Sequence, residues 1–371
     1  MPASGQTIIQ IFEQWVSKAY AEPDDKIGLQ LGTLNKPVQT VLTALDVTEE
    51  VVDEAIAAGA DLIIAHHAII FRPLKTLRTD TPAGRIYEKC IKHDIAVYIA
   101  HTNLDVAPGG INDMMADALG LENRTFLEEV VEDPLCKLVV YVPESHREAV
   151  SNALFAAGAG HIGKYSHCSF RTEGTGTFLP GEGTNPYIGS AGKLEHTPEI
   201  RVETVIPESL LKKAVAAMIK AHPYEEAAYD IYPLRLPGTK HGLGRVGSLP
   251  EPVTLAELCE RVKRAFDVPV VRAVGDPGRL INKAAVLGGS GSKFVRSALF
   301  AGADVLITGD IDYHTAQDAL ADGIALIDPG HNIEKIMKQG VADRLAKDLA
   351  AQKLDVRVIA SRVNTEPFRF V

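Results

Sequence analysis

Short apolar runs alternate along this chain with stretches in which apolar side chains recur at helical spacing. A run that is apolar throughout is typical of a strand buried in a parallel sheet, and recurrence every three or four residues is typical of a helix packed on it. Strands that alternate with helices imply right-handed βαβ crossovers and an α/β fold. The pattern predicts strands at 38–45, 61–65 and 95–100, and helices at 49–58 and 82–93, the second helix capped by Asp80 or Thr81.

This unit recurs near the end of the chain. Segment 59–67 (GADLIIAHH) resembles 302–310 (GADVLITGD), and segment 95–105 resembles 324–334. The two pairs have similar offsets, 243 and 229 residues, which favours a duplication over chance similarity of such runs. We therefore predict duplicated α/β lobes with mostly parallel sheets, which form one core from residues 1–127 and 239–371.

The intervening residues, 128–238, follow another pattern. Strands are expected at 138–145, 166–172, 202–209 and 227–234, helices at 147–157 and 210–221, and a glycine-rich hairpin at 174–192. This β-α-β-β-α-β order predicts an inserted ferredoxin-like α+β domain and resembles the CutA and PII trimeric signalling folds. The histidines of this segment show no ligand spacing and are interpreted as surface or structural residues: His146, His161, His167, His196 and His222.

Polar residues gather just past the predicted strand ends, where α/β sheets collect ligand groups. His66, His67 and Asp105 follow strands of the first lobe, and His331 and Glu334 follow a strand of the second. Three imidazoles and two carboxylates suit Zn, Fe, Mn or Co better than Ca or Mg, and five ligands could hold two metals ~3.5–4 Å apart. A hydroxide shared by two metals is a nucleophile for hydrolysis. The alternative for the adjacent histidines alone is an exposed or capping pair.

Several other sequence features give weaker signals. His101 and His314 are candidate catalytic residues that could shuttle protons, or they could instead hydrogen-bond to a ligand carboxylate. Gly288–Ser292 could cradle an anion, although a plain strand-to-helix turn accounts for it. The G-x-G-x-x-G match at Gly242–Gly247 lacks the strand and helix context of a dinucleotide site and is interpreted as structural.

The paired histidines, TNLD at 102–105, GDIDYH at 309–314 and GHNIE at 330–334 resemble the GTP cyclohydrolase I type 2 homologue family, also called NGG-interacting-factor-like proteins. KIGLQLG at 26–32 and GLGRVG at 242–247 resemble further stretches of that family, so the resemblance covers nearly the whole chain. The insert matches a longer bacterial form. Two departures are Ala68, where the family usually has Pro, and Pro23–Asp25 in place of Trp-Asp-Asn.

The resemblance implies a dinuclear centre of two divalent ions per subunit (Zn, Fe or Mn) held by His66, His67, Asp105, His331 and Glu334. It also implies a toroidal homohexamer whose sites face an internal cavity. The family name suggests a hydrolase that opens a purine ring, and more broadly one that acts on a nucleotide or related small molecule through a metal-bound hydroxide. A non-catalytic hexameric metal-binding scaffold, metallochaperone or regulator is the alternative.

Composition and charge limit the kinds of partner that this chain is expected to bind. The 371 residues include 38 basic and 48 acidic ones, a formal net charge of −10, which disfavours broad binding to nucleic acid. The sequence contains no apolar stretch long enough for a membrane span and no secretory signal at its start. Its four cysteines lie far apart and form no CxxC pair, so we expect free thiols in a reducing cytoplasm.

Overall fold

The computed structural model describes residues 3–370, which form two compact units. Unit 1 comprises residues 1–131 and 241–371, and unit 2 comprises residues 132–240. The sequence pattern predicts the inserted domain at residues 128–238, whereas unit 2 spans residues 132–240. Two long strands, β7 (Glu122–Asp133) and β12 (Thr239–Thr254), run across the borders, and the change in sequence pattern therefore does not mark a break in the chain's secondary structure.

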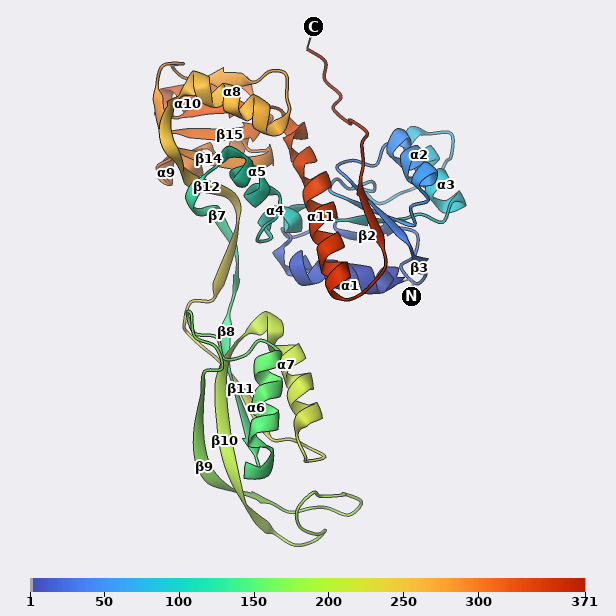
Figure 1. Ribbon diagram of the computed structural model, residues 1–371, viewed down its shortest axis with the longest axis vertical. Helices are drawn as coiled ribbons and strands as arrows, with labels where there is room; N and C mark the ends of the chain where they lie inside the picture. The colour runs from blue at the N-terminus through green and yellow to red at the C-terminus, as the bar shows by residue number, and fades with distance from the viewer. Residues whose placement is uncertain (1–2, 371) are drawn as a thin grey trace. The chain divides into compact units, whose positions relative to one another are not determined.

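The first half of unit 1 alternates helices with strands (Figure 1). Threonine side chains cap two of its helices, because their hydroxyl oxygens accept a hydrogen bond from the third residue of the helix. Its elements are β1 (Ala3–Ser4), α1 (Gly5–Trp15), η1 (Lys18–Tyr20), β2 (Gly28–Leu31), β3 (Pro37–Val38), β4 (Thr40–Ala44), α2 (Glu49–Ala58), β5 (Leu62–Ala65), α3 (Pro82–Lys92), β6 (Ala96–Ile99), α4 (Thr102–Val106), α5 (Ile111–Leu119) and β7.

The second half of unit 1 repeats this succession after β12. Helix α8 corresponds to α1, strand β13 to β2, and strands β14, β15 and β16 to β4, β5 and β6. Its elements are α8 (Leu255–Phe266), β13 (Arg272–Val274), β14 (Leu280–Ser290), η3 (Ser292–Phe294), α9 (Val295–Phe300), β15 (Val305–Gly309), α10 (Tyr313–Asp322), β16 (Ala325–Asp328), η4 (His331–Lys335), α11 (Ile336–Ala351) and β17 (Arg357–Ala360).

Two sheets organise unit 1. The five-stranded sheet has the order β17-β4-β5-β6-β2, and all of its strands are parallel except the edge strand β2. The six-stranded sheet has the order β13-β16-β15-β14-β12-β7, in which β14, β15 and β16 are parallel, while β12 is antiparallel to β14 and β13 is antiparallel to β16. The prediction of mostly parallel sheets is therefore wrong for the second sheet. Adjacent parallel strands need a crossover connection, which α9 and α10 provide between β14, β15 and β16. Strands β12 and β13 lie outside this run and have the opposite direction.

Each half gives its last strand to the sheet of the other half. Strand β7 follows α5 and joins the six-stranded sheet, and β17 follows α11 and joins the five-stranded sheet. Helix α5 packs on β14, and α11 packs on β4. Neither sheet is complete without the other half of the sequence.

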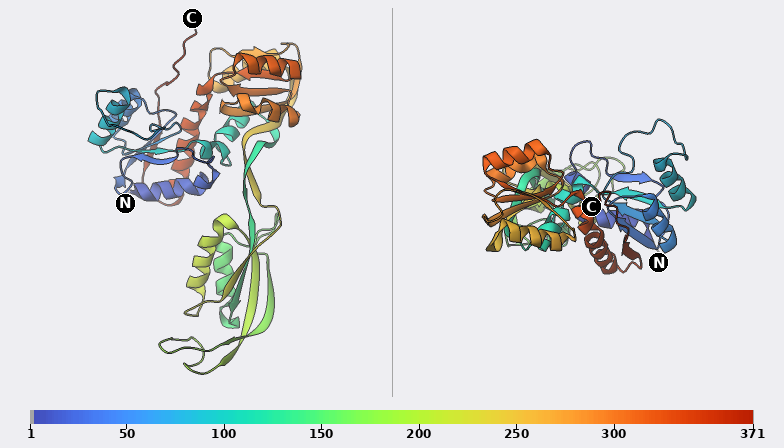
Figure 2. Two further views of the ribbon diagram at one scale, coloured as in Figure 1. Left: turned by 180° about the vertical axis from the view of Figure 1, so that it is seen from behind. Right: turned by 90° about the horizontal axis from the view of Figure 1, so that it is seen from above.

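One apolar cluster fills the space between the two sheets. It takes side chains such as Ile64 from the five-stranded sheet and Ile307 from the six-stranded sheet, together with the buried faces of α1, α5, α8 and α11. Figure 2 shows α11, coloured red, between the sheets. Helices α2 and α3 cover the outer face of one sheet, and α9 and α10 cover the outer face of the other. Unit 1 is therefore a layered α/β body with one shared inner core.

Unit 2 is a four-stranded antiparallel sheet with two helices on one face. Leu138, Val140 and Val202 of the sheet pack against Leu154 and Met218 of the helices. The strand order is β11-β8-β10-β9, and all three pairings are antiparallel. Its elements are β8 (Leu135–Val142), η2 (Glu144–His146), α6 (Arg147–Ala156), β9 (Ser169–Phe178), β10 (Glu195–Pro207), α7 (Glu208–Ala221) and β11 (Tyr229–Pro233).

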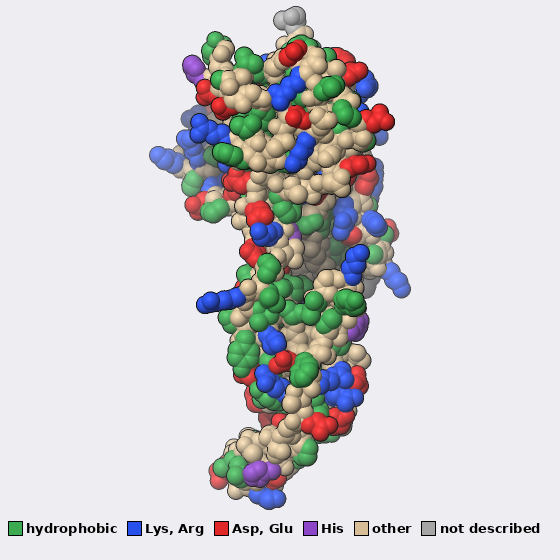
Figure 3. All heavy atoms as spheres, turned by 90° about the vertical axis from the view of Figure 1, so that its left-hand side faces the viewer, with side chains coloured by type: hydrophobic (Ala, Val, Ile, Leu, Met, Phe, Trp, Pro, Cys, Tyr) green, Lys and Arg blue, Asp and Glu red, His purple; other side chains and the backbone are tan. Residues whose placement is uncertain are grey.

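Within residues 3–370, none of the helices combines the length and the apolar character needed to cross a membrane. On the face drawn in Figure 3, basic and acidic side chains are interspersed, and basic ones do not gather into a continuous stripe. Broad binding of a phosphate backbone on that face would require such a stripe.

The shared core yields a stability prediction. Leu345 of α11 is 1% exposed within it, and Leu345→Ala is expected to lower the free energy of unfolding by about 2–5 kcal/mol, because the truncation leaves a cavity. Trp15, the sole tryptophan, is buried in the same core, so its fluorescence during denaturant unfolding reports on unit 1. Leu320→Ala is the control, because Leu320 is 56% exposed; equal effects of the two substitutions would contradict the packing.

Candidate metal centre

The paired histidines follow directly from β5. The backbone N–H of His66 donates to the carbonyl of Ala44 (3.2 Å), and that of His67 donates to the carbonyl of Leu45 (2.9 Å), so the chain stays alongside the end of β4. The His66 ring is fully buried, whereas His67 is partly exposed. Their ring centroids lie 5.0 Å apart with the planes tilted by 50°, so both rings reach the same site.

The carboxylate of Glu334 lies at the middle of this site. It is supplied by η4 and is 3% exposed. Its Oε1 is 3.6 Å from His66 Nε2, and its Oε2 is 3.1 Å from His67 Nε2 and 3.2 Å from His331 Nε2. Gly289 leaves room for it, because a Cβ at that position would lie 2.8 Å from Oε1. The glycine-rich turn that the sequence suggested as an anion cradle therefore accommodates a carboxylate of the protein itself.

Two buried polar atoms here lack a hydrogen-bond partner among the described residues. They are His66 Nε2 and Asp105 Oδ1, which lie 3.9 Å apart. Asp105 is carried by α4, the short helix after β6. A buried polar atom left without a partner costs roughly 1–3 kcal/mol, so this pair fits a cation that both atoms would ligate. Nitrogen and carboxylate oxygen together suit a transition-metal ion.

Each histidine of the site has its Nδ1 engaged outside the cluster, so Nε2 is the atom that could ligate a metal. Nδ1 of His66 donates to the carbonyl of Ala100 at 2.9 Å. The other three donate to carboxylates, as histidine ligands of metals commonly do. The pairs are His67 with Asp46 (2.7 Å), His331 with Asp310 (2.7 Å) and His101 with Asp25 (2.9 Å).

Three groups of side chains place their ligand atoms within 4.8 Å of one another. Two of the groups share Glu334, and a third consists of histidines alone. The groups are His66, Asp105 and Glu334; His67, His331 and Glu334; and His66, His67 and His101. These residues could hold metal, and Glu334 offers one oxygen to each of the first two groups.

The structure thus brings together the five residues proposed as ligands from the sequence, and it adds His101 beside them. It does not bring His314 there. The His314 side chain is exposed on the first turn of α10, where its ring makes an edge-to-face contact with Tyr313, with centroids 5.5 Å apart.

Sequence reasoning assigned no role to Asp25, Asp46 or Thr365. The position of Asp46 could have indicated a role, because Asp46 follows the carboxyl end of β4 as the paired histidines follow β5. The hydroxyl of Thr365 donates to Asp46 and so links the C-terminal segment to His67. No local sequence pattern predicts that link, because it joins residues far apart in the sequence.

Charges around the cluster set its protonation. Burial alone would lower the pKa of His67, but hydrogen bonds with Asp46 and Glu334 raise it to about 10. The hydrogen bond with Glu334 likewise raises the pKa of His331 to about 9. Burial raises the pKa of Asp105 to about 6, whereas the surrounding imidazoles outweigh burial and hold the pKa of Glu334 well below its usual value.

A cavity of about 630 Å³ opens beside the cluster. His67 and His331 line it together with Asp46 and Asp310, so the cluster's solvent-facing side borders the cavity. Arg272 and the exposed ring of Phe368 lie on other parts of the wall. The volume is in the range of small-molecule sites.

Comparison with known proteins gives consistent matches. The family model described as Duf34/NIF3 (NGG1p interacting factor 3) matches residues 3–367. A GTP cyclohydrolase 1 type 2 homolog of Halalkalibacterium halodurans is 58% identical over 369 residues, with 100% of this chain and 99% of the relative covered. The homolog of Bacillus subtilis is 54% identical over 368 residues, with 99% of each covered. A solved structure of a Bacillus cereus protein related to NIF3 superposes with a TM-score of 0.94 at 53% identity, covering both chains fully.

The position of Gly289 predicts a specific loss of metal affinity. Gly289→Ala would push against Glu334 Oε1 and should weaken Zn²⁺ binding about tenfold or more, measured by competition with a chromophoric chelator. Gly323→Ala is the matched control: Gly323 has a similar positive φ (78° against 63°), but a Cβ there meets no atom within 4 Å. Both substitutions carry the left-handed backbone penalty of roughly 1–2 kcal/mol. Equal Zn²⁺ affinities of the two variants would contradict the role given to Gly289.

The raised histidine pKa values predict proton release on metal binding. At pH 7 the metal-free protein holds protons on His67 and His331, whose pKa values are about 10 and 9, and a metal must displace both. Zn²⁺ binding should release about two or more protons, and apparent affinity should rise as pH increases from 6 towards 9. Calorimetry in two buffers of different ionisation enthalpy counts these protons. Binding without proton release would show that the site is already deprotonated.

Proposed function

This chain belongs to the Duf34/NIF3 family, and from that premise we propose that it is a metal-dependent hydrolase acting on a nucleotide or related small molecule. The observation that carries the proposal is the buried carboxylate of Glu334 between two groups of ligand atoms. One group contains two buried polar atoms that have no hydrogen-bond partner within the described residues. Such a donor set fits transition metals. The curated relatives are named as homologs of a GTP cyclohydrolase, which supports a nucleotide as the substrate class.

We propose a dinuclear centre with Glu334 as the shared ligand. His66 and Asp105 would complete one metal position, and His67 and His331 the other. Zn, Fe or Mn fits these nitrogen and oxygen donors. When bound, two such ions supply Lewis acidity, which activates water for attack and stabilises negative charge that develops on the substrate.

The surrounding residues of the chain fix the imidazoles for this task. Asp46 and Asp310 accept the Nδ1 protons of His67 and His331, and these hydrogen bonds set the tautomer and the ring orientation. Asp310 adopts a left-handed backbone conformation (φ 58°) at this position, and such strain is typical of functional sites.

We assign proton transfer to His101. Its ring centroid lies 4.9 Å from that of His66, and its Nδ1 donates to Asp25, so Nε2 is the atom left to accept or release a proton. Hydrogen bonds from His101 and Thr102 outweigh burial and lower the pKa of Asp25, so this carboxylate stays ionised and holds the ring. His314, exposed on α10, has no comparable contact with the cluster among the described residues.

The adjoining cavity provides the substrate site of this proposal. Arg272, which also pairs with Asp328 of the same wall, has a guanidinium suited to phosphate or carboxylate. Phe368 gives the cavity an exposed aromatic ring on which a base could stack. An anionic, partly aromatic small molecule meets both features. The net charge of −10 and the mixed charges of the face in Figure 3 count against a nucleic acid.

Three further features belong to this proposal. We class unit 2 as a ferredoxin-like domain, because its β-α-β-β-α-β order and antiparallel sheet have that topology. We propose the toroidal homohexamer that the family resemblance implies. Four free cysteines support a reducing, cytoplasmic setting.

The proposal predicts metal-dependent turnover. Protein with metal content fixed by elemental analysis is incubated with a panel of nucleotides and related small molecules, and products are identified by mass spectrometry. Glu334→Gln should lose bound metal and all turnover, because the shared carboxylate charge is removed. His101→Ala should keep its metal and lower kcat about 10²-fold or more, the usual contribution of a positioned proton-transfer group. His93→Ala, an exposed histidine at the end of α3, is the control.

His314→Ala decides between the two histidines singled out in the sequence. A fall in kcat in His314→Ala, with His101→Ala unaffected, would overturn the assignment of proton transfer to His101. Tight metal binding with no turnover across the panel would overturn the hydrolase and favour a non-catalytic metal-binding scaffold.

A further inference from the structure

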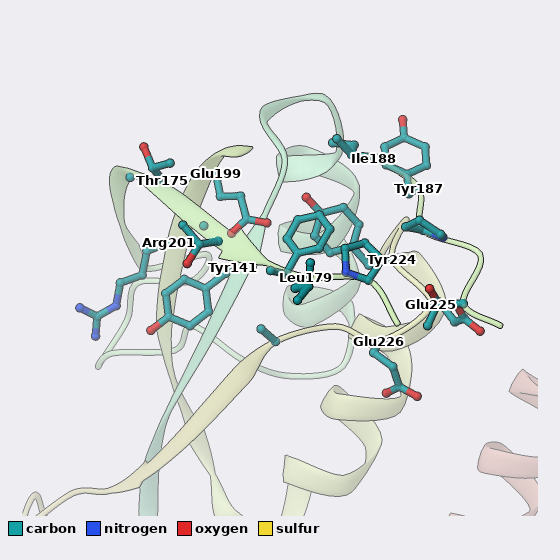
Figure 4. Close-up of a pocket in the computed structure, with 18 of the residues that line it drawn as sticks. Tyr141, Thr175, Leu179, Tyr187, Ile188, Glu199, Arg201, Tyr224, Glu225 and Glu226 are labelled. Carbon is teal, nitrogen blue, oxygen red and sulfur yellow. The ribbon is translucent and has the colours of Figure 1, made fainter. Parts of the chain in front are cut away.

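A second cavity lies wholly within unit 2, apart in sequence from every residue of the metal cluster. It measures about 580 Å³ and lies between strands β9 and β10, the loop 179–194 and the turn after α7. Figure 4 shows side chains from all of these segments around it. Its volume falls within the range of small-molecule sites.

Two glycines on one face of β9 leave this space open. Gly174 and Gly176 are two residues apart, so both positions point to the same side of the sheet. A Cβ on Gly174 would meet no atom within 4 Å, whereas one on Gly176 would lie 2.1 Å from Glu199 Oε2. The first glycine therefore leaves open space, and the second makes room for the Glu199 carboxylate.

The charges lining the cavity are mostly negative. Four carboxylates contribute to the wall, those of Glu173, Glu199, Glu225 and Glu226, and none of them has a lysine or arginine within 4.0 Å in the described part of the chain. The single guanidinium, Arg201, pairs with Glu203 at 3.1 Å and points away from the other labelled residues in Figure 4. The lining thus carries more negative than positive charge, with Glu199 partly buried and the other three carboxylates exposed to solvent.

Aromatic rings form another part of the wall. Tyr224 lies beside Phe178 and Tyr187, with ring centroids 6.1 and 6.2 Å away. Its hydroxyl is buried, and burial together with the nearby Glu199 carboxylate raises its pKa. Faces of aromatic rings attract organic cations, and carboxylates pair with them.

We propose that this cavity binds a small organic cation, an amine or amidine carried on an apolar or aromatic body. Glu199 would pair with the cationic group, and the rings of Phe178, Tyr187 and Tyr224 would contact the body. An anion such as a nucleotide phosphate would meet four carboxylates here. A bare metal ion is disfavoured, because none of these carboxylates belongs to a group with metal-ligand spacing in the described residues.

The test compares three probes of nearly equal shape on the full-length, metal-loaded protein: benzamidine, neutral benzamide and anionic benzoate. Binding is measured by calorimetry and by ligand-observed NMR. Benzamidine should bind, benzamide about tenfold or more weakly, and benzoate should show no binding that depends on this cavity. Failure of benzamidine to bind at about 10 mM, or benzoate binding that a cavity substitution abolishes, would overturn the proposal.

Two substitutions localise the effect. Gly174→Leu fills the cavity from a position where a Cβ meets nothing, and it should abolish benzamidine binding. Glu199→Gln keeps the shape but removes one charge, and it should weaken binding about tenfold. Glu208→Gln, which removes a charge from the start of α7 away from the lining, is the control. Unchanged affinity in Glu199→Gln would overturn the proposal even if Gly174→Leu fails to fold.

These outcomes are independent of the proposed hydrolase. Cation binding in unit 2 can be present or absent whatever the turnover of the metal cluster, because no residue of the cavity contributes to that cluster.

Discussion

The apolar core shared by the two sheets of unit 1 is the constraint on which the rest of that unit depends. Each sheet lacks a strand until the other half of the sequence supplies β7 or β17, and α5 and α11 bury their apolar faces between the sheets. Hydrophobic burial in this layer therefore holds both halves in a fixed relation. His66 and Asp105 follow strands of one sheet, and Glu334 follows a strand of the other, so the same packing that stabilises the fold also assembles the cluster.

The burial of Glu334 explains the electrostatics of the cluster. A carboxylate that is 3% exposed is costly unless positive charge surrounds it. In the metal-free protein, protonated imidazoles supply that charge, which is why the pKa values of His67 and His331 rise while that of Glu334 falls. A metal would replace protons with a larger charge at the same atoms, and the three aspartates that accept the Nδ1 protons would remain in place.

How far the sequence predicts this protein depends on the range of the interactions. Helix α2 was expected at 49–58 and is found there, because a threonine cap, a helical apolar pattern and a terminal glycine all act within a few residues. The five residues proposed as ligands could be singled out because strand ends collect functional groups, and the structure places their side chains in one cluster. The antiparallel strands of the six-stranded sheet and the exchange of β7 and β17 were missed, because pairing between distant segments leaves no local pattern. The same reason hid the link from Thr365 through Asp46 to His67.

Glycine makes room for a protein side chain in unit 1 and leaves open space in unit 2. The difference lies in the atoms that a Cβ at each position would contact. At Gly289 a Cβ would strike the carboxylate that the cluster needs, so the glycine there admits a group of the protein itself. At Gly174 a Cβ would meet nothing, so the glycine there leaves space that the protein does not fill. Close packing is the rule in protein interiors, and voids larger than a water molecule are few. Gly174 lies on an exposed strand, so this rule does not require its space to be filled, and the space stays open to a ligand beside the carboxylates and aromatic rings.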